Sequence, residues 1–155
     1  NELVPEHNLY IKKHPREIIS HWDIMLKEYP SVNIVNKHIM QLATKADFVI
    51  SFWGSGAMDC FMLGVPVIEY WDPLKHNKQQ VYENGTFTTI YRKLGVVTAA
   101  NNEKELKKAI SHLKLNNFHI ETDKVHFFYT DLIKRSNDWK QTFEKIISVN
   151  GFLNN

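Results

Sequence analysis

The segment at residues 47–70 constrains the fold more than any other part of the sequence. It holds two short apolar runs, 47–52 and 65–70, separated by a Gly-Ser-Gly turn and a helix-like stretch at 57–63. The first run (DFVISF) is apolar on both faces, as in a strand that is covered on both sides in a parallel sheet. A buried strand, a helix and a second buried strand in succession predict a parallel α/β unit.

The same alternation extends along most of the chain. Further strands are predicted at 9–13, 32–35 and 96–99, and helices at 15–29, 37–45, about 78–82, from 101 or 102 onward and within 123–150. The chain of 155 residues has the length of one domain. We therefore predict one Rossmann-like α/β domain over residues 1–155, a parallel sheet with helices on both faces.

Composition narrows the classes of protein that remain. The chain is 43% hydrophobic, which suits a packed core, and its formal net charge of +2 does not indicate a nucleic-acid partner. Cys60 is the one cysteine, so an internal disulfide is excluded and a cytoplasmic location is expected. The chain has no apolar run long enough to cross a membrane. It begins with Asn1 rather than Met, so we expect a chain that was cut from a larger protein or processed, with partner domains missing.

Ligands of open parallel sheets bind beyond the carboxyl ends of the strands. This rule selects Lys13 and His14, residues 53–59 and residues 70–76. Metal chemistry has no support there, because the eight histidines are scattered and no His or Cys pair has ligand spacing.

The turn formed by Gly54, Ser55 and Gly56 permits two interpretations. Two glycines and the start of a helix suit a phosphate site, where backbone N–H groups and the Ser55 hydroxyl would hold the anion. Alternatively, Ser55 only caps its helix and the glycines only turn the chain.

Three other motifs fail at this turn. A nucleophile elbow, G-x-S-x-G, needs glycine where the chain has Trp53 and Ala57. A dinucleotide fingerprint needs a third glycine where Asp59 stands. A phosphate-binding P-loop is excluded because no Gly-Lys-Ser/Thr follows.

The longer stretch ADFVISFWGSGAMDCFMLGVPVIEY resembles the donor-binding half of GT-B glycosyltransferases and the related UDP-N-acetylglucosamine 2-epimerases and capsule polysaccharide transferases. In these families an acidic residue stands five positions before the glycine of G-x-P-V-I, as Asp59 stands before Gly64 here. The upstream IKKHP resembles their His-Pro motif. The similarity covers residues 9–115.

The resemblance implies a role for each matching residue. Gly54, Ser55, Gly56 and Ala57 would hold the donor phosphates, and Asp59 would accept hydrogen bonds from the ribose hydroxyls. Asp59 stands where the family usually has glutamate, which puts the ribose contact in doubt. Lys13 and His14 would contact the phosphate or the nucleotide, unless His14 only bonds to nearby backbone. Fixed donors of this kind stabilise the charge on a departing phosphate, and they need no metal.

The resemblance also implies partners and a place in the cell. We expect a nucleotide sugar as donor, no other cofactor, a saccharide or lipid-linked acceptor, and a missing N-terminal domain that supplies the catalytic base. We expect synthesis of surface polysaccharide in the cytoplasm or at the inner face of the membrane, with the isolated domain inactive. Two alternatives stay open, a sugar-nucleotide epimerase and a non-catalytic α/β binding module.

Overall fold

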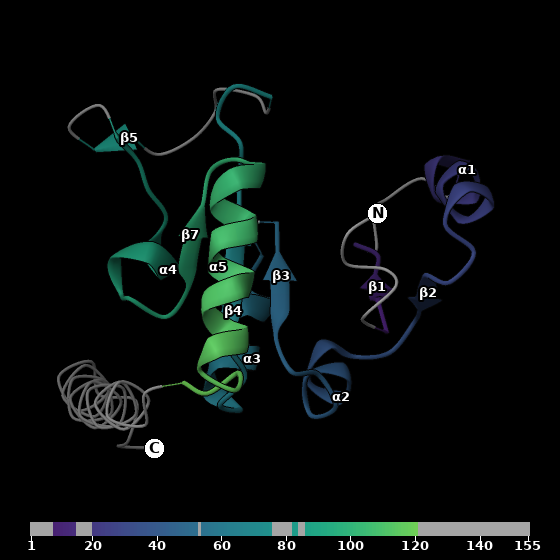
Figure 1. Cartoon of the computed structure of the whole chain (residues 1–155), viewed down its shortest axis with the longest axis horizontal. Coiled ribbons are helices and arrows are strands. Elements are labelled where there is room, and N and C mark those ends of the chain that lie inside the picture. The colour runs from purple at the N-terminus through teal and green to yellow at the C-terminus, as the bar shows by residue number, and fades with distance from the viewer. Residues whose placement is uncertain (1–7, 15–19, 53, 76–81, 84–85, 121–155) are drawn as a thin grey trace, which may run out of the picture.

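Short parallel strands alternate with helices, so the predicted α/β Rossmann-like fold is confirmed (Figure 1). The structure is a computed structural model, and it describes residues 8–14, 20–52, 54–75, 82–83 and 86–120. In chain order, the elements are β1 (Tyr10–Lys12), α1 (Ser20–Glu28), β2 (Asn33–Val35), α2 (Ile39–Ala43), β3 (Val49–Ser51), α3 (Gly56–Met62), β4 (Val67–Tyr70), β5 (Tyr82–Glu83), β6 (Thr86–Phe87), α4 (Ile90–Lys93), β7 (Thr98–Ala100) and α5 (Glu103–Leu115).

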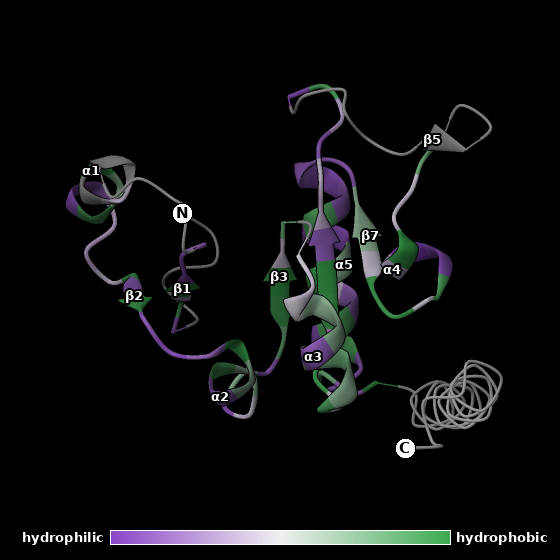
Figure 2. Cartoon of the chain, turned by 180° about the vertical axis from the view of Figure 1, so that it is seen from behind, coloured by the Kyte–Doolittle hydropathy of each residue, from purple (hydrophilic) through white to green (hydrophobic). Residues whose placement is uncertain are grey.

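The centre of the fold is a parallel sheet with strand order β3-β4-β7. Helix α5 covers one face of this sheet and α3 covers the other, as the views from the front and from behind show (Figures 1 and 2). The predicted covering by helices on both faces is therefore correct for this sheet.

Side chains of β4 alternate between two hydrophobic clusters. Val67 packs with Ala57 and Cys60 of α3, whereas Ile68 packs with Ile110 and Leu113 of α5. Both β4 residues are almost completely buried, at 3% and 0% exposed. A strand buried on both faces needs apolar residues at successive positions, which explains the continuous apolar run in the sequence.

Local signals set the ends of the helices. Gly64 has a positive φ of 75° directly after the last residues of α3, and Pro66 prevents the helix from continuing. Asn102 caps α5, because its side chain accepts a hydrogen bond from the Glu105 N–H. Both helix ends match the sequence predictions.

The structure differs from the predictions in the arrangement of its strands. Strands β1 and β2 pair in parallel with each other in a second sheet, which lies apart from β3-β4-β7 in both views (Figures 1 and 2). An apolar pattern identifies a strand but does not determine its neighbour, so the expected single sheet was wrong within the described residues.

A hairpin and a short helix were not predicted. Tyr82 belongs to β5, which pairs antiparallel with β6, so the prediction of a helix at about 78–82 was wrong at this residue. Helix α4 follows, and its first turn is capped by the Thr89 hydroxyl, which accepts from the Arg92 N–H. The first part of the predicted helix at 15–29, residues 15–19, and the helices predicted within 123–150 lie outside the described residues.

The described helices are also too short or too polar to cross a lipid bilayer.

Candidate functional site

The Gly54-Ser55-Gly56 turn begins three residues after the last residue of β3, beyond the carboxyl end of the strand, where ligands of parallel sheets bind. Ser55 occupies the N-cap position of α3, but its backbone has helical angles (φ −58°, ψ −25°) and its hydroxyl makes no capping hydrogen bond. The side chain is exposed. The Ser55 side chain therefore does not cap α3, and its hydroxyl is accessible to solvent or to a ligand.

The two glycines of the turn have different surroundings. A Cβ atom added to Gly54 would meet no atom within 4 Å, so the space beside this residue is open. A Cβ atom added to Gly56 would lie 3.3 Å from Cγ1 of Ile39 in α2. Gly56 therefore allows α3 to pack closely on α2, whereas Gly54 leaves room for a ligand near the backbone.

The backbone of the turn already uses part of its hydrogen-bonding capacity. The Ala57 N–H donates to the Gly54 carbonyl at 3.1 Å, and the Met58 N–H donates to the Ser55 carbonyl at 3.0 Å. Ala57 itself is 1% exposed. Among the described residues, the N–H groups of Gly54, Ser55 and Gly56 have no backbone acceptor, so these groups and the Ser55 hydroxyl are left for an anion.

Asp59 lies one turn into α3 and is half-buried. The described residues include no salt bridge or hydrogen-bond partner for its carboxylate, although both neighbours in the sequence are apolar. Its charge reaches the Cys60 thiol, where burial first and Asp59 second raise the pKa of Cys60 to about 11. Cys60 is fully buried and remains a protonated, unreactive thiol at neutral pH.

Lys13 and His14 follow β1, with Lys13 half-buried and His14 exposed. Because β1 belongs to the two-stranded sheet, these residues stand at a different sheet from Ser55 and Asp59 (Figure 1). The structure thus brings together the predicted residues at 54–59 and does not join the predicted pair at 13–14 to them.

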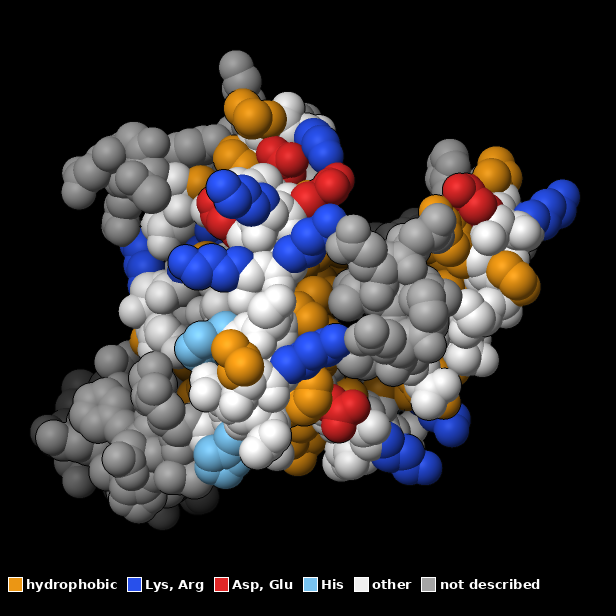
Figure 3. Space-filling model, viewed as in Figure 1, with side chains coloured by type: hydrophobic (Ala, Val, Ile, Leu, Met, Phe, Trp, Pro, Cys, Tyr) orange, Lys and Arg blue, Asp and Glu red, His pale blue; other side chains and the backbone are white. Residues whose placement is uncertain are grey.

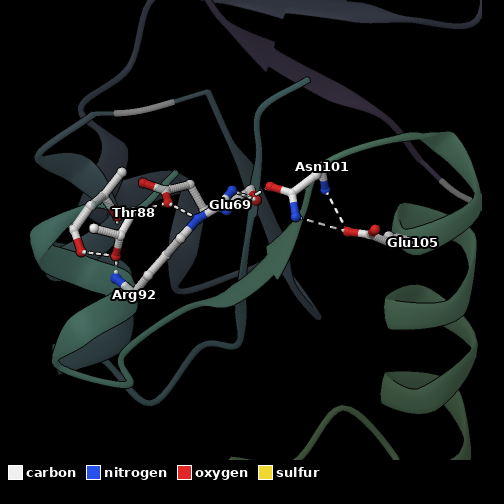
Figure 4. Close-up of polar contacts among 6 residues, drawn as sticks. Glu69, Thr88, Arg92, Asn101 and Glu105 are labelled. Carbon is white, nitrogen blue, oxygen red and sulfur yellow. Dashed lines mark hydrogen bonds and ion pairs between the residues drawn. The ribbon is translucent and has the colours of Figure 1, made fainter. Parts of the chain in front are cut away.

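A polar cluster near the carboxyl end of β4 was not found from the sequence (Figure 4). Glu69 is 0% exposed and its Oε2 accepts hydrogen bonds from the Thr89 hydroxyl at 2.8 Å and from Arg92 Nε at 2.7 Å. The Arg92 guanidinium also donates to the Glu69 carbonyl at 3.2 Å and lies 4.7 Å from the centre of the Phe87 ring. This buried ion pair fastens α4 to β4.

The cluster continues to the residue that follows β7. Arg92 donates to Asn101 Oδ1 at 2.7 Å, and the Asn101 N–H donates to Glu105 Oε2 at 2.8 Å (Figure 4). That backbone hydrogen bond is the main reason why the pKa of Glu105 is lowered below 4.5. The Asn102 amide donates to the other Glu105 oxygen at 2.9 Å, which completes a reciprocal cap of α5.

These contacts give the cluster a structural role. The Arg92 side chain is only 9% exposed and is surrounded by acceptors, so it offers little charge to a ligand. The sequence signal for it was Glu69 itself, an acid inside an otherwise apolar strand, because a buried charge requires a partner.

Another group of charged side chains contains the exposed Lys75 and the buried Asp72. Lys75 lies 3.7 Å from Asp72 and 3.6 Å from Glu103, so two carboxylates share its charge. Figure 3 shows Lys and Arg side chains over the outer face of α5, where Lys104, Lys107, Lys108 and Lys114 are exposed to solvent. No group of three His, Cys, Asp or Glu side chains that could hold a metal ion occurs among the described residues.

Comparisons with protein-family models, with curated proteins and with solved structures found no match to this chain. The fold and the arrangement of residues 54–59 are therefore the basis for a functional proposal.

Proposed function

We propose that this chain is the nucleotide-sugar-binding domain of a glycosyltransferase that makes surface polysaccharide. The observation that supports the proposal is that the described fold makes no structural use of the Ser55 and Asp59 side chains. Both follow the carboxyl end of β3, and the described fold uses neither the Ser55 hydroxyl as a cap nor the Asp59 carboxylate in an ion pair. Polar groups that a fold does not use, at the edge where ligands bind, support a ligand-binding role.

The two side chains suit different parts of a nucleotide sugar. The Ser55 hydroxyl and the N–H groups of Ser55 and Gly56 are hydrogen-bond donors, which phosphate oxygens accept. The Asp59 carboxylate is an acceptor and would take hydrogen bonds from ribose hydroxyls. Gly54 leaves open space beside the turn for the ligand. Lys13 and His14 follow a strand of the other sheet, so the proposed site is limited to residues 54–59.

Donors fixed around a diphosphate would stabilise the negative charge that develops when the sugar leaves. In this proposal, a second domain of the same protein would bind the acceptor and supply the catalytic base. The carboxylate within residues 54–59, that of Asp59, would already bind the ribose. The isolated chain is then expected to bind a nucleotide and to transfer no sugar.

Titration of the 155-residue chain with UDP, GDP, CDP and CMP, followed by calorimetry and by NMR, tests the proposal. Loss of a hydrogen bond to a charged group makes the free energy of binding substantially less favourable. Ser55→Ala and Asp59→Ala should therefore each weaken binding by about 10- to 100-fold.

Matched controls are available at exposed positions away from the turn. Ser111→Ala in α5 and Asp47→Ala before β3 remove the same groups from exposed sites and should leave the affinity unchanged. Absence of binding to all four nucleotides would overturn the proposal, as would equal losses in the control variants.

A further inference from the structure

Phe52 is an aromatic side chain that the fold leaves in solvent at the carboxyl end of β3. Its side chain is 66% exposed, although it continues a strand whose previous residues are at least half-buried. Single exposed apolar residues are common on proteins, so exposure alone carries no meaning. Phe52 differs from the other exposed apolar residues in its place, because Gly54 and Ser55 follow it within three positions of the sequence.

The contacts of Phe52 fix the side of the sheet on which it lies. Ile50, two residues earlier, packs in the cluster under α5, and so does Tyr70 at the end of the neighbouring strand. The register pairs Ser51 with Glu69, so Phe52 lies across from Tyr70. The two rings meet edge to face, with centroids 5.8 Å apart and planes inclined at 76°.

An edge-to-face contact leaves aromatic surface uncovered. If the Tyr70 edge meets one face of Phe52, Tyr70 does not cover the opposite face; if the Phe52 edge meets Tyr70, Tyr70 covers neither face of Phe52. Tyr70 therefore contacts the Phe52 ring from one direction, while the side chain, three positions before Ser55 in the sequence, stays 66% exposed. Planar heteroaromatic rings stack on such surfaces. Purines and pyrimidines can all do so, because every base has a π-face.

We infer that Phe52 is the stacking surface for the base of the bound nucleotide, an inference that rests on the proposed function. The nucleotide would cross the carboxyl edge of the sheet between β3 and β4. Its base would lie on the α5 side against Phe52, and its phosphates would lie on the α3 side at Ser55 and Gly56. Phe52 then contributes affinity for any nucleobase, whereas the turn contributes affinity for phosphate.

Binding of a nucleotide and of ribose 5-phosphate to the same variants tests this division. Base stacking contributes substantially to the free energy of binding. Phe52→Ala should therefore weaken binding of the tightest-binding nucleotide among UDP, GDP, CDP and CMP by about 10- to 100-fold. Ribose 5-phosphate has no base, so its affinity should be the same in both proteins. Phe52→Trp keeps a flat ring and should retain nucleotide binding. Leu115→Ala, which removes an 83% exposed side chain at the far end of α5, is the matched control.

An NMR measurement separates stacking from a merely structural role. Ring-current effects should move the base protons of the bound nucleotide upfield with the wild-type chain and not with Phe52→Ala. If the wild-type chain binds nucleotide and Phe52→Ala binds it equally well, the stacking inference fails and the proposed function stands. Equal losses of affinity for nucleotide and for ribose 5-phosphate would also overturn the stacking inference, because Phe52 would then only support the turn. If the wild-type chain binds no nucleotide, both ideas fail.

Discussion

Replacement of Arg92 by methionine would remove the cation from a buried ion pair and leave the Glu69 carboxylate inside the protein. The side chains are 9% and 0% exposed, so the value of up to about 1 kcal/mol for surface ion pairs does not apply. Removal of one partner from a buried pair costs about 3–5 kcal/mol, because the other charge stays uncompensated. Methionine keeps most of the aliphatic stem, so the loss is mainly electrostatic.

Three side-chain hydrogen bonds disappear with the guanidinium. They run from Arg92 to Glu69 Oε2, to the Glu69 carbonyl and to Asn101 Oδ1. The other Glu69 oxygen has no hydrogen-bond partner in the described structure, so Thr89 would be the last donor to the carboxylate. We therefore expect the free energy of unfolding to fall by about 4 kcal/mol, within the range for breaking a buried pair.

Urea denaturation followed by circular dichroism measures this loss. With a denaturant slope of about 2 kcal/mol per molar, the midpoint should fall by about 2 M. The double variant Glu69→Leu/Arg92→Met contains no buried charge and should recover most of the stability. Lys108→Met, at an exposed position of α5, should change stability by no more than about 0.5 kcal/mol. A loss below about 1 kcal/mol for Arg92→Met, or a double variant no more stable than the single one, would refute the reasoning.

Two further predictions concern the turn and the cap of α5. Gly54→Ala should be neutral or stabilising by up to about 1 kcal/mol, since its Cβ enters open space, while Gly56→Ala should lose about 1 kcal/mol of stability by crowding Ile39. Thermal unfolding measures the stability of both variants. A Gly56→Ala variant more stable than Gly54→Ala would contradict the packing role of Gly56. Glu105→Gln should lower stability at pH 7 and have less effect in acid. The lowered pKa of Glu105 means that its contribution is complete above pH 4.5 and is lost as the pH falls through the folded-state value. Urea denaturation at pH 7 and pH 3 measures the difference between wild type and variant, and a difference that does not shrink in acid would count against the hydrogen bond from Asn101.

The strands and most helices could be predicted because their signals are local. The run of residues 65–68 is apolar at successive positions, and Gly64 and Pro66 mark where α3 ends. The β5–β6 hairpin also had a local signal that the prediction overlooked. Asn84-Gly85 separates Glu83 from Thr86 in the sequence, and Asn-Gly is a frequent pair in two-residue hairpin turns.

The parts that could not be predicted depend on residues far apart in the sequence. Glu69 and Arg92 are separated by 23 positions, and no periodicity in either segment indicates that they meet. The same limit explains the strand order, because β1 and β2 have the apolar character of strands without a feature that selects their neighbours. In the candidate site, the order of residues 54–59 was readable, whereas the open space at Gly54 and the contact of Gly56 with Ile39 required the structure.

The alternation of β4 has a consequence for how this chain tolerates insertions and deletions. A shift of β4 by one residue would turn Glu69 toward the aliphatic side chains of Ile110 and Leu113 and would present Ile68 to Arg92. Two charges would then be buried without partners, so the shifted pairing would be far less stable than the observed one. Glu69 thus fixes the pairing register of β4, a strand of only four residues, between its two neighbouring strands.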